Sequence, residues 1–323
     1  MYKENQVCIF IGEELGLYSF GKGHPFGLKR MGVFWDEVVR QGLDKKLSIC
    51  KPVIAHQTEI EIFHTHEYVE RVKAQSLSGK GFLDYGDTPA FKGVYEAAAF
   101  TTGTCLDALN RIISGECKRV FIPIAGFHHA RRDSAGGFCT FNDCGILIET
   151  LRDKYKIKSI AYIDIDAHHG DGVYYSFEDD PDVYIADIHE DGRFLYPGTG
   201  AIEETGTGNA RGTKLNIPLP PYADDKVFFQ IWPQIEEFID KARPEIILFQ
   251  CGADGLSDDP ITHLRYSESV HTNVALSLTK LADRHCSGRI LAMGGGGYNL
   301  NNIAKAWTAI ISAFLEENNS LSS

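Results

Sequence analysis

Residues 159–171 read SIAYIDIDAHHGD, in which an apolar, β-branched run is followed directly by carboxylates, histidines and a glycine. Near-continuous apolar character over about six residues is typical of a strand buried on both faces, as in a parallel sheet. The polar residues would then lie at the carboxyl end of that strand, which is where open α/β sheets bind their ligands. This stretch therefore predicts both a fold class and the location of a functional site.

The same apolar pattern recurs along the chain, with helical patterns in between. Strands are expected at residues 7–11, 120–124, 159–165, 183–188, 246–251 and 290–293, and helices at 95–113, 225–242 and 267–282. Strands that alternate with helices indicate an α/β fold with a doubly wound, mostly parallel sheet flanked by helices. No linker, repeat or low-complexity tract interrupts the chain, so we expect one domain over residues 1–323, with a frayed tail at 316–323.

Composition and charge narrow the class of protein. The 323 residues contain 44 Asp and Glu against 32 Lys and Arg, a net charge of −12, which disfavours nucleic-acid binding. No apolar run approaches the ~20 residues of a membrane helix and residues 1–6 lack a signal-peptide profile, so we expect a cytoplasmic protein without membrane contact. The eight cysteines form no C-x-x-C pair and are expected to be reduced thiols, which leaves histidines and carboxylates as metal ligands.

Ligand-type side chains follow several of the expected strands. Asp166 and His168 are two residues apart at the end of the strand at 159–165, so they point to the same side, and Asp254 follows the strand at 246–251. One histidine and two carboxylates with an open fourth position form a catalytic zinc arrangement. The alternative is a set of capping and surface groups, which is disfavoured because so many ionisable groups on a buried edge are costly without a role.

The dipeptide His128-His129 follows the strand at 120–124. Adjacent histidines diverge, so we do not expect both to bind one ion; one could serve as a general base and the other as an electrostatic or acid partner. Asp164 and Asp171 are candidate acceptors that would hold their tautomers. Taken alone, such a dipeptide is more often structural. The functional interpretation is favoured because the dipeptide would face the Asp/His cluster.

The glycine run at 294–297, which leads into Tyr298, allows two interpretations. It could cradle a phosphate, although the Lys and Ser/Thr of a P-loop are missing, or it could present the Tyr298 hydroxyl to a developing oxyanion. The loops around Phe138 and Tyr196 either line a narrow apolar channel or are tight turns with incidental aromatics. The metal-like spacing of His64 and His66 lies in a polar stretch and is interpreted as structural.

At these residues the sequence resembles the zinc-dependent histone deacetylase superfamily, which includes class I lysine deacetylases, bacterial acetoin-utilisation deacetylases and acetylpolyamine amidohydrolases. The resemblance covers roughly residues 20–315, and its motifs stand in family order. The motifs are Gly23-His24-Pro25 with Arg30, Gly126-Phe127-His128-His129-Ala130, Gly136-Gly137-Phe138-Cys139 with Phe141-Asn142-Asp143, and the runs 164–172, 197–200, 216–219, 252–254 and 295–298. The resemblance implies an arginase-like α/β fold and the hydrolysis of N-acetyl amides to acetate and a free amine.

The resemblance also implies a catalytic machinery built around one Zn²⁺ ion. Asp166, His168 and Asp254 resemble the zinc ligands. His129 resembles the general base, which later protonates the leaving amine, and His128 resembles its electrostatic partner.

Three further catalytic positions are carried over in the same way. Asp171 resembles the carboxylate paired with His129, and Asp164 resembles the one paired with His128. Tyr298 resembles the tyrosine that polarises the amide carbonyl together with zinc.

The remaining positions concern substrate and ions. Residues that resemble substrate-binding positions at the rim, channel wall and mouth are Asp87, Gly137, Phe138, Tyr196 and Ile261, and Arg30 resembles a basic residue below the site. Two positions depart from the family pattern. Tyr196 stands where phenylalanine is usual, and Asp187 stands where serine is frequent, at a site for a monovalent cation such as K⁺. A carboxylate there could bind K⁺ more tightly or seek another partner.

Two substrate classes present the same acetamide on an alkyl chain: acetyl-lysine in proteins or peptides, and acetylated polyamines. Polyamine-selective members tend to carry an acidic gatekeeper where Ile261 stands, so the apolar residue favours acetyl-lysine. The carboxylates of Asp84, Asp87, Asp258 and Asp259 would instead suit a polycation. The sequence indicates no oligomeric state.

Two rival classes remain. A dinuclear manganese hydrolase of the arginase type needs a further aspartate two positions before Asp254, where this chain has Gly252. A non-catalytic binding module is disfavoured because every reactive position is filled.

Overall fold

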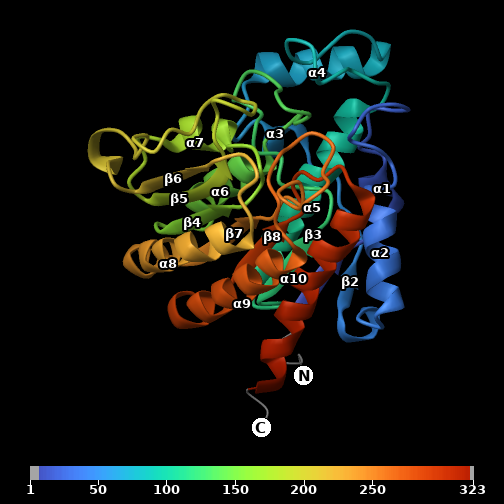
Figure 1. Ribbon diagram of the computed structural model, residues 1–323. Coiled ribbons are helices and arrows are strands. Elements are labelled where there is room, and N and C mark those ends of the chain that lie inside the picture. Colours follow the sequence, from blue (N-terminus) through green and yellow to red (C-terminus); the bar gives the residue numbers. More distant parts are fainter. Residues whose placement is uncertain (1–6, 321–323) are drawn as a thin grey trace.

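The computed structural model describes residues 7–320 and places the eight strands of that part in one sheet (Figure 1). The strands are β1 (Val7–Phe10), β2 (Ser48–Cys50), β3 (Arg119–Ile122), β4 (Ile160–Asp164), β5 (Val183–Glu190), β6 (Lys214–Leu219), β7 (Ile246–Gln250) and β8 (Ile290–Met293). Their order across the sheet is β2-β1-β3-β8-β7-β4-β5-β6, and every neighbouring pair is parallel.

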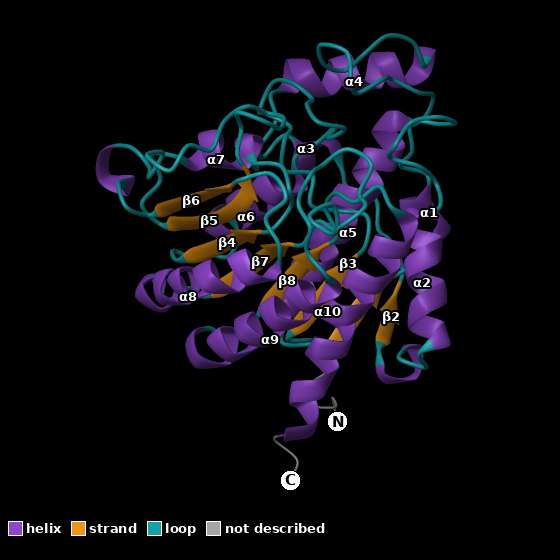
Figure 2. Cartoon of the chain, in the orientation of Figure 1, coloured by secondary structure: helices purple, strands orange, loops and turns teal. Residues whose placement is uncertain are grey.

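Helices cover both faces of this sheet. They are α1 (Glu13–Gly16), α2 (Arg30–Arg40), α3 (Gln57–Ile60), α4 (His66–Ser78), α5 (Val94–Ile113), α6 (Asp143–Asp153), α7 (Asp171–Phe177), α8 (Asp225–Ala242), α9 (Glu268–His285) and α10 (Leu300–Ser320), with short 3₁₀ helices at Asp44–Lys46 and Gly208–Ala210. Figure 2 shows α8, α9 and α10 on one face and α5 and α6 on the other. The predicted doubly wound α/β fold is confirmed.

The six strands expected from the sequence are the interior strands of the sheet, and the two edge strands were not expected. All residues of β3, β4, β7 and β8 are buried, which explains why these strands are apolar except at Arg119, Asp164 and Gln250 at their ends. At one edge, β2 is short and half-exposed. At the other edge, β6 contains Pro218, whose missing N–H is tolerated where no further strand pairs.

Some predictions concern the chain ends and the cysteines. Helix α10 continues to Ser320, so the first part of the segment 316–323 that was expected to fray is helical; residues 321–323, and residues 1–6 at the other end, lie outside the described part. The eight cysteines are free thiols and are buried, as expected. Among the helices of residues 7–320, none is both long and apolar enough to cross a membrane.

The parallel arrangement places the carboxyl ends of the strands at one edge of the sheet (Figure 1). The segments that leave this edge after β3, β4, β7 and β8 carry the polar motifs of the sequence. Because β8, β7 and β4 are neighbours, motifs from distant parts of the chain meet there.

Candidate active site

Asp166, His168 and Asp254 meet at the carboxyl ends of two neighbouring strands. Asp166 and His168 follow β4, and Asp254 follows β7, which pairs with β4. The Nδ1 atom of His168 lies 3.1 Å from one carboxylate oxygen of each aspartate. All three side chains are buried, and one ligand atom from each lies within 4.8 Å of the other two. The structure thus brings together the three residues predicted as metal ligands.

This donor set fits a divalent cation. Burial and the neighbouring Asp166 carboxylate raise the pKa of Asp254 to about 7, because two negative charges in a buried site repel each other. A cation bound between them would remove that repulsion. One imidazole nitrogen and two carboxylate oxygens, with a further position open, are a ligand set that catalytic zinc accepts.

Backbone and amide N–H groups hold both carboxylates in place. The Ala167 N–H donates to Asp254 Oδ1 at 2.9 Å, and Gln250 Nε2 and the Gly296 N–H each donate to Asp166 Oδ2 at 2.8 Å. Such outer contacts orient ligands before an ion binds. Gln250 was not predicted from the sequence, although one polar residue at the end of the otherwise apolar strand IILFQ is a signal that could have found it.

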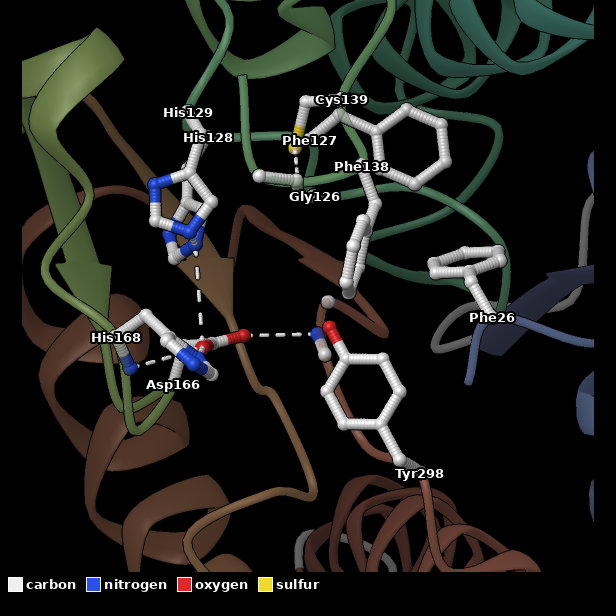
Figure 3. Close-up of a pocket in the computed structure, with 13 residues that line it drawn as sticks. Phe26, Gly126, Phe127, His128, His129, Phe138, Cys139, Asp166, His168 and Tyr298 are labelled. Atoms are coloured by element: carbon white, nitrogen blue, oxygen red, sulfur yellow. Dashed lines mark hydrogen bonds and ion pairs between the residues drawn. The ribbon is translucent and has the colours of Figure 1, made fainter. Parts of the chain in front are cut away.

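Two histidine–aspartate pairs lie above the ligand residues. His128 Nδ1 is 2.7 Å from Asp164 Oδ2, and His129 Nδ1 is 2.8 Å from Asp171 Oδ1. Figure 3 shows both imidazoles above Asp166 and His168. Each histidine therefore lies against the carboxylate that the family resemblance implies for it.

The expectation that the two adjacent histidines diverge is wrong. Their Nδ1 atoms face different carboxylates, but their Nε2 atoms lie only 3.0 Å apart. Side chains of neighbouring residues point to opposite sides only in a regular strand. His128 and His129 lie instead in the irregular segment after β3, where Gly126 has a φ of +88°.

The two imidazoles have opposite protonation preferences. Burial alone would lower both pKa values. At His128 the carboxylates of Asp164 and Asp166 outweigh burial and raise the pKa to about 10. At His129 burial and the positive charge of His128 lower the pKa to about 4. A charged imidazole thus stands beside a neutral one, which is the separation of acid and base roles that proton-transfer catalysis uses.

Tyr298 reaches the same pocket from the segment after β8. Figure 3 shows its hydroxyl between Phe138 and Asp166. Burial and the carboxylates of Asp254 and Asp166 raise the pKa of Tyr298 well above its ordinary value, so the hydroxyl is a neutral donor. The Tyr298 backbone N–H is anchored by Asp259 Oδ2 at 2.8 Å, a contact that sequence reasoning missed.

The glycine run favours the tyrosine-presenting interpretation over the phosphate cradle. A cradle needs unpaired backbone N–H groups. Here the N–H groups of Gly294 and Gly295 donate to backbone carbonyls of residues 122 and 125, and that of Gly296 donates to Asp166.

Arg30 supports this segment from below. Its buried guanidinium donates to the carbonyls of Gly297 at 3.0 Å and Gly295 at 2.5 Å, and it stacks 3.9 Å from the centre of the Phe26 ring. Arg30 therefore fixes the backbone that leads to Tyr298.

Aromatic rings wall the approach to the site. Phe138 meets the Tyr298 ring edge-on at 5.8 Å between centres, and Tyr196 meets the His129 ring at 5.0 Å. The space between the catalytic side chains measures about 20 Å³, about one water molecule. The aromatic loops thus form a narrow entrance, as the channel interpretation expects.

Gly137 offers a direct test of this narrow geometry. Its φ is +52°, and a Cβ there would lie 2.3 Å from His129 Cδ2 and 3.0 Å from the Tyr196 ring. We expect Gly137→Ala to lower kcat/KM by about 10²-fold through displacement of the His129 ring. Gly208→Ala is the matched control, because Gly208 has the same φ of +52° with nothing within 4 Å. Equal kcat/KM values for the two variants would contradict the prediction.

A groove of about 910 Å³ continues from the entrance. Asp87 lines it together with Asp84, Asp133, Arg71 and Arg131. Burial and the neighbouring Asp84 raise the pKa of Asp87 to about 7.

Asp259 links Ile261 to the segment that carries Tyr298, since its two oxygens accept the N–H groups of both residues. Ile261 is half-buried, its N–H donates to Asp259 Oδ1 at 3.1 Å, and among the described residues it is not one that lines the narrow pocket or the groove.

Asp187 has partners within the protein. Its Oδ1 lies 2.7 Å from His189 Nδ1, and its Oδ2 accepts the Gly170 N–H at 2.8 Å. Of the two alternatives for a carboxylate at this position, these contacts favour another partner over tighter K⁺ binding.

His64 and His66 do not share a site. Buried His64 accepts the Asn142 N–H at Nε2, at 2.8 Å, whereas His66 is exposed and pairs with Glu61. Burial lowers the pKa of His64 to about 3, so it is a neutral structural residue.

Comparisons with known proteins show the family to which the chain belongs. The family model described as "Histone deacetylase domain" matches residues 24–314. The acetoin utilization protein AcuC of Bacillus subtilis (strain 168) is 36% identical over 305 residues, which cover 91% of this chain and 78% of AcuC. AcuC of Staphylococcus xylosus is 32% identical over 313 residues, covering 94% and 81% of the two chains.

A solved structure supports the fold. The HD domain of HDA15 superposes with a TM-score of 0.88 at 24% identity, over 97% of this chain and 89% of that one. With the extent of the family match and the similarity to AcuC, the conclusion is that the chain belongs to the histone deacetylase family.

Proposed function

We propose that the protein is a zinc-dependent amidohydrolase that cleaves N-acetyl amides, with Nε-acetyl-lysine in proteins as its substrate. The observation that carries the proposal is a convergence in one narrow pocket. A buried Asp-His-Asp ligand set, two histidine–aspartate pairs and a neutral tyrosine hydroxyl surround a space entered between aromatic rings.

The chain's own residues have separable roles in this reaction. Zn²⁺, when bound to Asp166, His168 and Asp254, supplies polarisation of the acetyl carbonyl and acidification of a water molecule. His129 accepts the proton of the attacking water, since its low pKa keeps it neutral and Asp171 fixes its Nδ1 proton.

Charge stabilisation and product release follow from the same residues. The Tyr298 hydroxyl donates a hydrogen bond to the oxygen on which negative charge develops. His128, whose Nδ1 is 2.7 Å from Asp164 and whose Nε2 is 3.0 Å from His129, serves as the electrostatic partner of His129. His129 then returns its proton to the departing amine, and acetate and a free amine leave.

The groove at the entrance bears on the substrate class. Acetylated polyamines are favoured by the carboxylates of Asp84, Asp87 and Asp133 that line it. Arg71 and Arg131 line the same groove, which suits the mixed charges of a peptide better than a polycation.

The carboxylate of Asp259 does not change this conclusion. Asp259 is 8% exposed, and its two oxygens accept the N–H groups of Tyr298 and Ile261. Its charge is therefore not available to a substrate amine.

A side-by-side assay of the zinc-loaded full chain tests the substrate. We expect an acetyl-lysine peptide to exceed N-acetylputrescine and N-acetylcadaverine by more than about tenfold in kcat/KM, roughly 1.4 kcal/mol in transition-state stabilisation. The reverse order would make the protein a polyamine deacetylase. Lack of turnover of all three substrates would overturn the proposed chemistry.

Tyr298→Phe tests the oxyanion role within that assay. Removal of one donor to a developing oxyanion is expected to lower kcat by about 10²–10³-fold, with KM little changed. Tyr155→Phe is a control, because the Tyr155 hydroxyl contacts only the side chain of Asn110 among the described hydrogen bonds. Equal kcat values for the two variants would exclude the role.

The metal count separates this proposal from a dinuclear hydrolase. Among the side chains that the structure describes, those of residues 7–316, Asp166, His168 and Asp254 are the one cluster of His, Cys, Asp or Glu with metal-binding spacing. We therefore expect one zinc ion per chain by elemental analysis, and two manganese ions would favour the arginase-type rival.

A further inference from the structure

Asp187 and His189 form a buried pair that the proposed mechanism does not use. They are two residues apart on β5, so their side chains lie on the same face of the sheet, and both are 0% exposed. His189 Nδ1 is 2.7 Å from Asp187 Oδ1, and His189 Nε2 is 2.9 Å from the Gly200 carbonyl oxygen. Both ring nitrogens face acceptors, so both carry a proton and the ring is a cation that Asp187 neutralises.

One end of this pair holds the segment that carries Tyr196. Gly200 packs directly on His189, since a Cβ at Gly200 would lie 2.4 Å from His189 Nε2. The next residue back, Thr199, contacts His169 Nδ1 through its hydroxyl at 2.8 Å. These contacts attach the segment 196–200 to β5 and to His169. Tyr196, the first residue of this segment, lies against the His129 ring.

The other end holds the segment that carries the metal-ligand residues. Asp187 Oδ2 accepts the Gly170 N–H at 2.8 Å. Gly170 lies between the ligand residue His168 and Asp171, the partner of His129. Asp187 is also the register partner of Asp164 across β4 and β5, so it stands beside the carboxylate that holds His128.

We propose that the Asp187–His189 pair is a positioning bridge. It holds Tyr196, in the wall of the entrance, in a fixed position relative to the segment 166–171. The bridge runs from Gly200 through His189 and Asp187 to Gly170. It deepens the proposed function and rests on it for the substrate arm of the test, while its effect on metal affinity is independent of any substrate.

Because of these contacts, substitutions at the two ends of the bridge are expected to have different effects. Loss of His189 frees the segment 196–200 but leaves the Gly170 N–H with its acceptor. Loss of the Asp187 side chain frees both segments. Asparagine at 187 preserves the bridge, because its oxygen can accept the Gly170 N–H and its amide can donate to a neutral His189.

Three variants measured together test the bridge. In Asp187→Ala we expect the zinc Kd to rise about 10–100-fold, the range for loss of contacts that orient ligands, and KM for the acetyl-lysine peptide to rise as well. In Asp187→Asn we expect the zinc Kd and KM to stay within about twofold of the parent protein, as the preserved contacts require. In the double variant Asp187→Asn with His189→Ala, we expect a raised KM with an unchanged zinc Kd.

The double variant also keeps the test independent of folding. His189→Ala alone would leave a buried, uncompensated carboxylate and lower Tm, and asparagine at 187 removes that charge. His66→Ala is the matched control, since His66 makes a 2.7 Å contact with Glu61 at an exposed site.

Two results would overturn the proposal. One is a set of variants that differ in Tm while the zinc Kd and KM stay at parent values, which is the pattern of a purely structural pair. The other is Asp187→Asn weakening zinc binding as much as Asp187→Ala. If the parent protein turned over no acetylated substrate, the proposed function would fail, and the zinc Kd values of these two variants would still decide between bridge and no bridge.

Discussion

The Asp254→Asn variant is expected to lose bound zinc and with it nearly all turnover. Asparagine has the size of aspartate, and its carbonyl can still accept the Ala167 N–H, now 2.9 Å from Asp254 Oδ1. Its amide nitrogen then faces His168 in the place of a ligand oxygen. Because loss of outer contacts alone weakens metal binding 10–100-fold, we expect loss of a ligand to exceed about 10²-fold in zinc Kd.

A matched substitution four residues along the chain controls for this change. Asp258 is exposed and has a φ of +68°, a conformation that asparagine tolerates well. Asp258→Asn should keep the zinc content of the parent protein. Retention of stoichiometric zinc by Asp254→Asn after dialysis would remove Asp254 from the ligand set.

The His129→Ala variant is expected to keep its zinc but lose about 10²–10⁴-fold in kcat. The structure places His129 against Asp171 and His128, and it is not among the three residues that converge as metal ligands. Measurement of zinc content beside kcat separates loss of the base from loss of the metal. A variant that lost zinc in proportion to activity would contradict the assignment.

Asp171 provides the second half of this test. Its contact with His129 Nδ1 at 2.8 Å implies that it acts through His129. We expect Asp171→Asn to lower kcat less than His129→Ala, and the double variant to be no slower than His129→Ala alone, because residues that act as a unit are not additive. Multiplied losses in the double variant would show that Asp171 acts by another route.

The interior strands of the sheet could be predicted from the sequence because strands that are buried on both faces are rich in apolar residues. The strands IAYID and IILFQ are buried throughout and are apolar up to their last residues, Asp164 and Gln250. The edge strands lack this apolar pattern. Ser48–Cys50 is short and half-exposed. The strand Lys214–Leu219 contains Pro218, which has no backbone N–H and is tolerated only at the edge of a sheet.

The positions of the site residues were readable for a related reason. Polar groups directly after buried strands must lie at the carboxyl edge of a parallel sheet, so Asp166, His168 and Asp254 could be placed on that edge before any coordinates. The resemblance to a known family then suggested which histidine faces which carboxylate. The structure shows those pairs at 2.7 and 2.8 Å.

By itself, the sequence determined the fold class, the interior strands and the edge at which the site lies, because hydrophobic periodicity and burial are local properties of a chain. Only the tertiary structure decided that the Nε2 atoms of His128 and His129 converge, that Gln250 supports Asp166 and that His189 meets the Gly200 carbonyl. The first depends on an irregular backbone after β3, and the second depends on the order of strands, which puts β7 beside β4. The last depends on how the segment 196–200 folds back over β5. These contacts depend on an irregular backbone or on packing between segments, and local residue patterns predict neither.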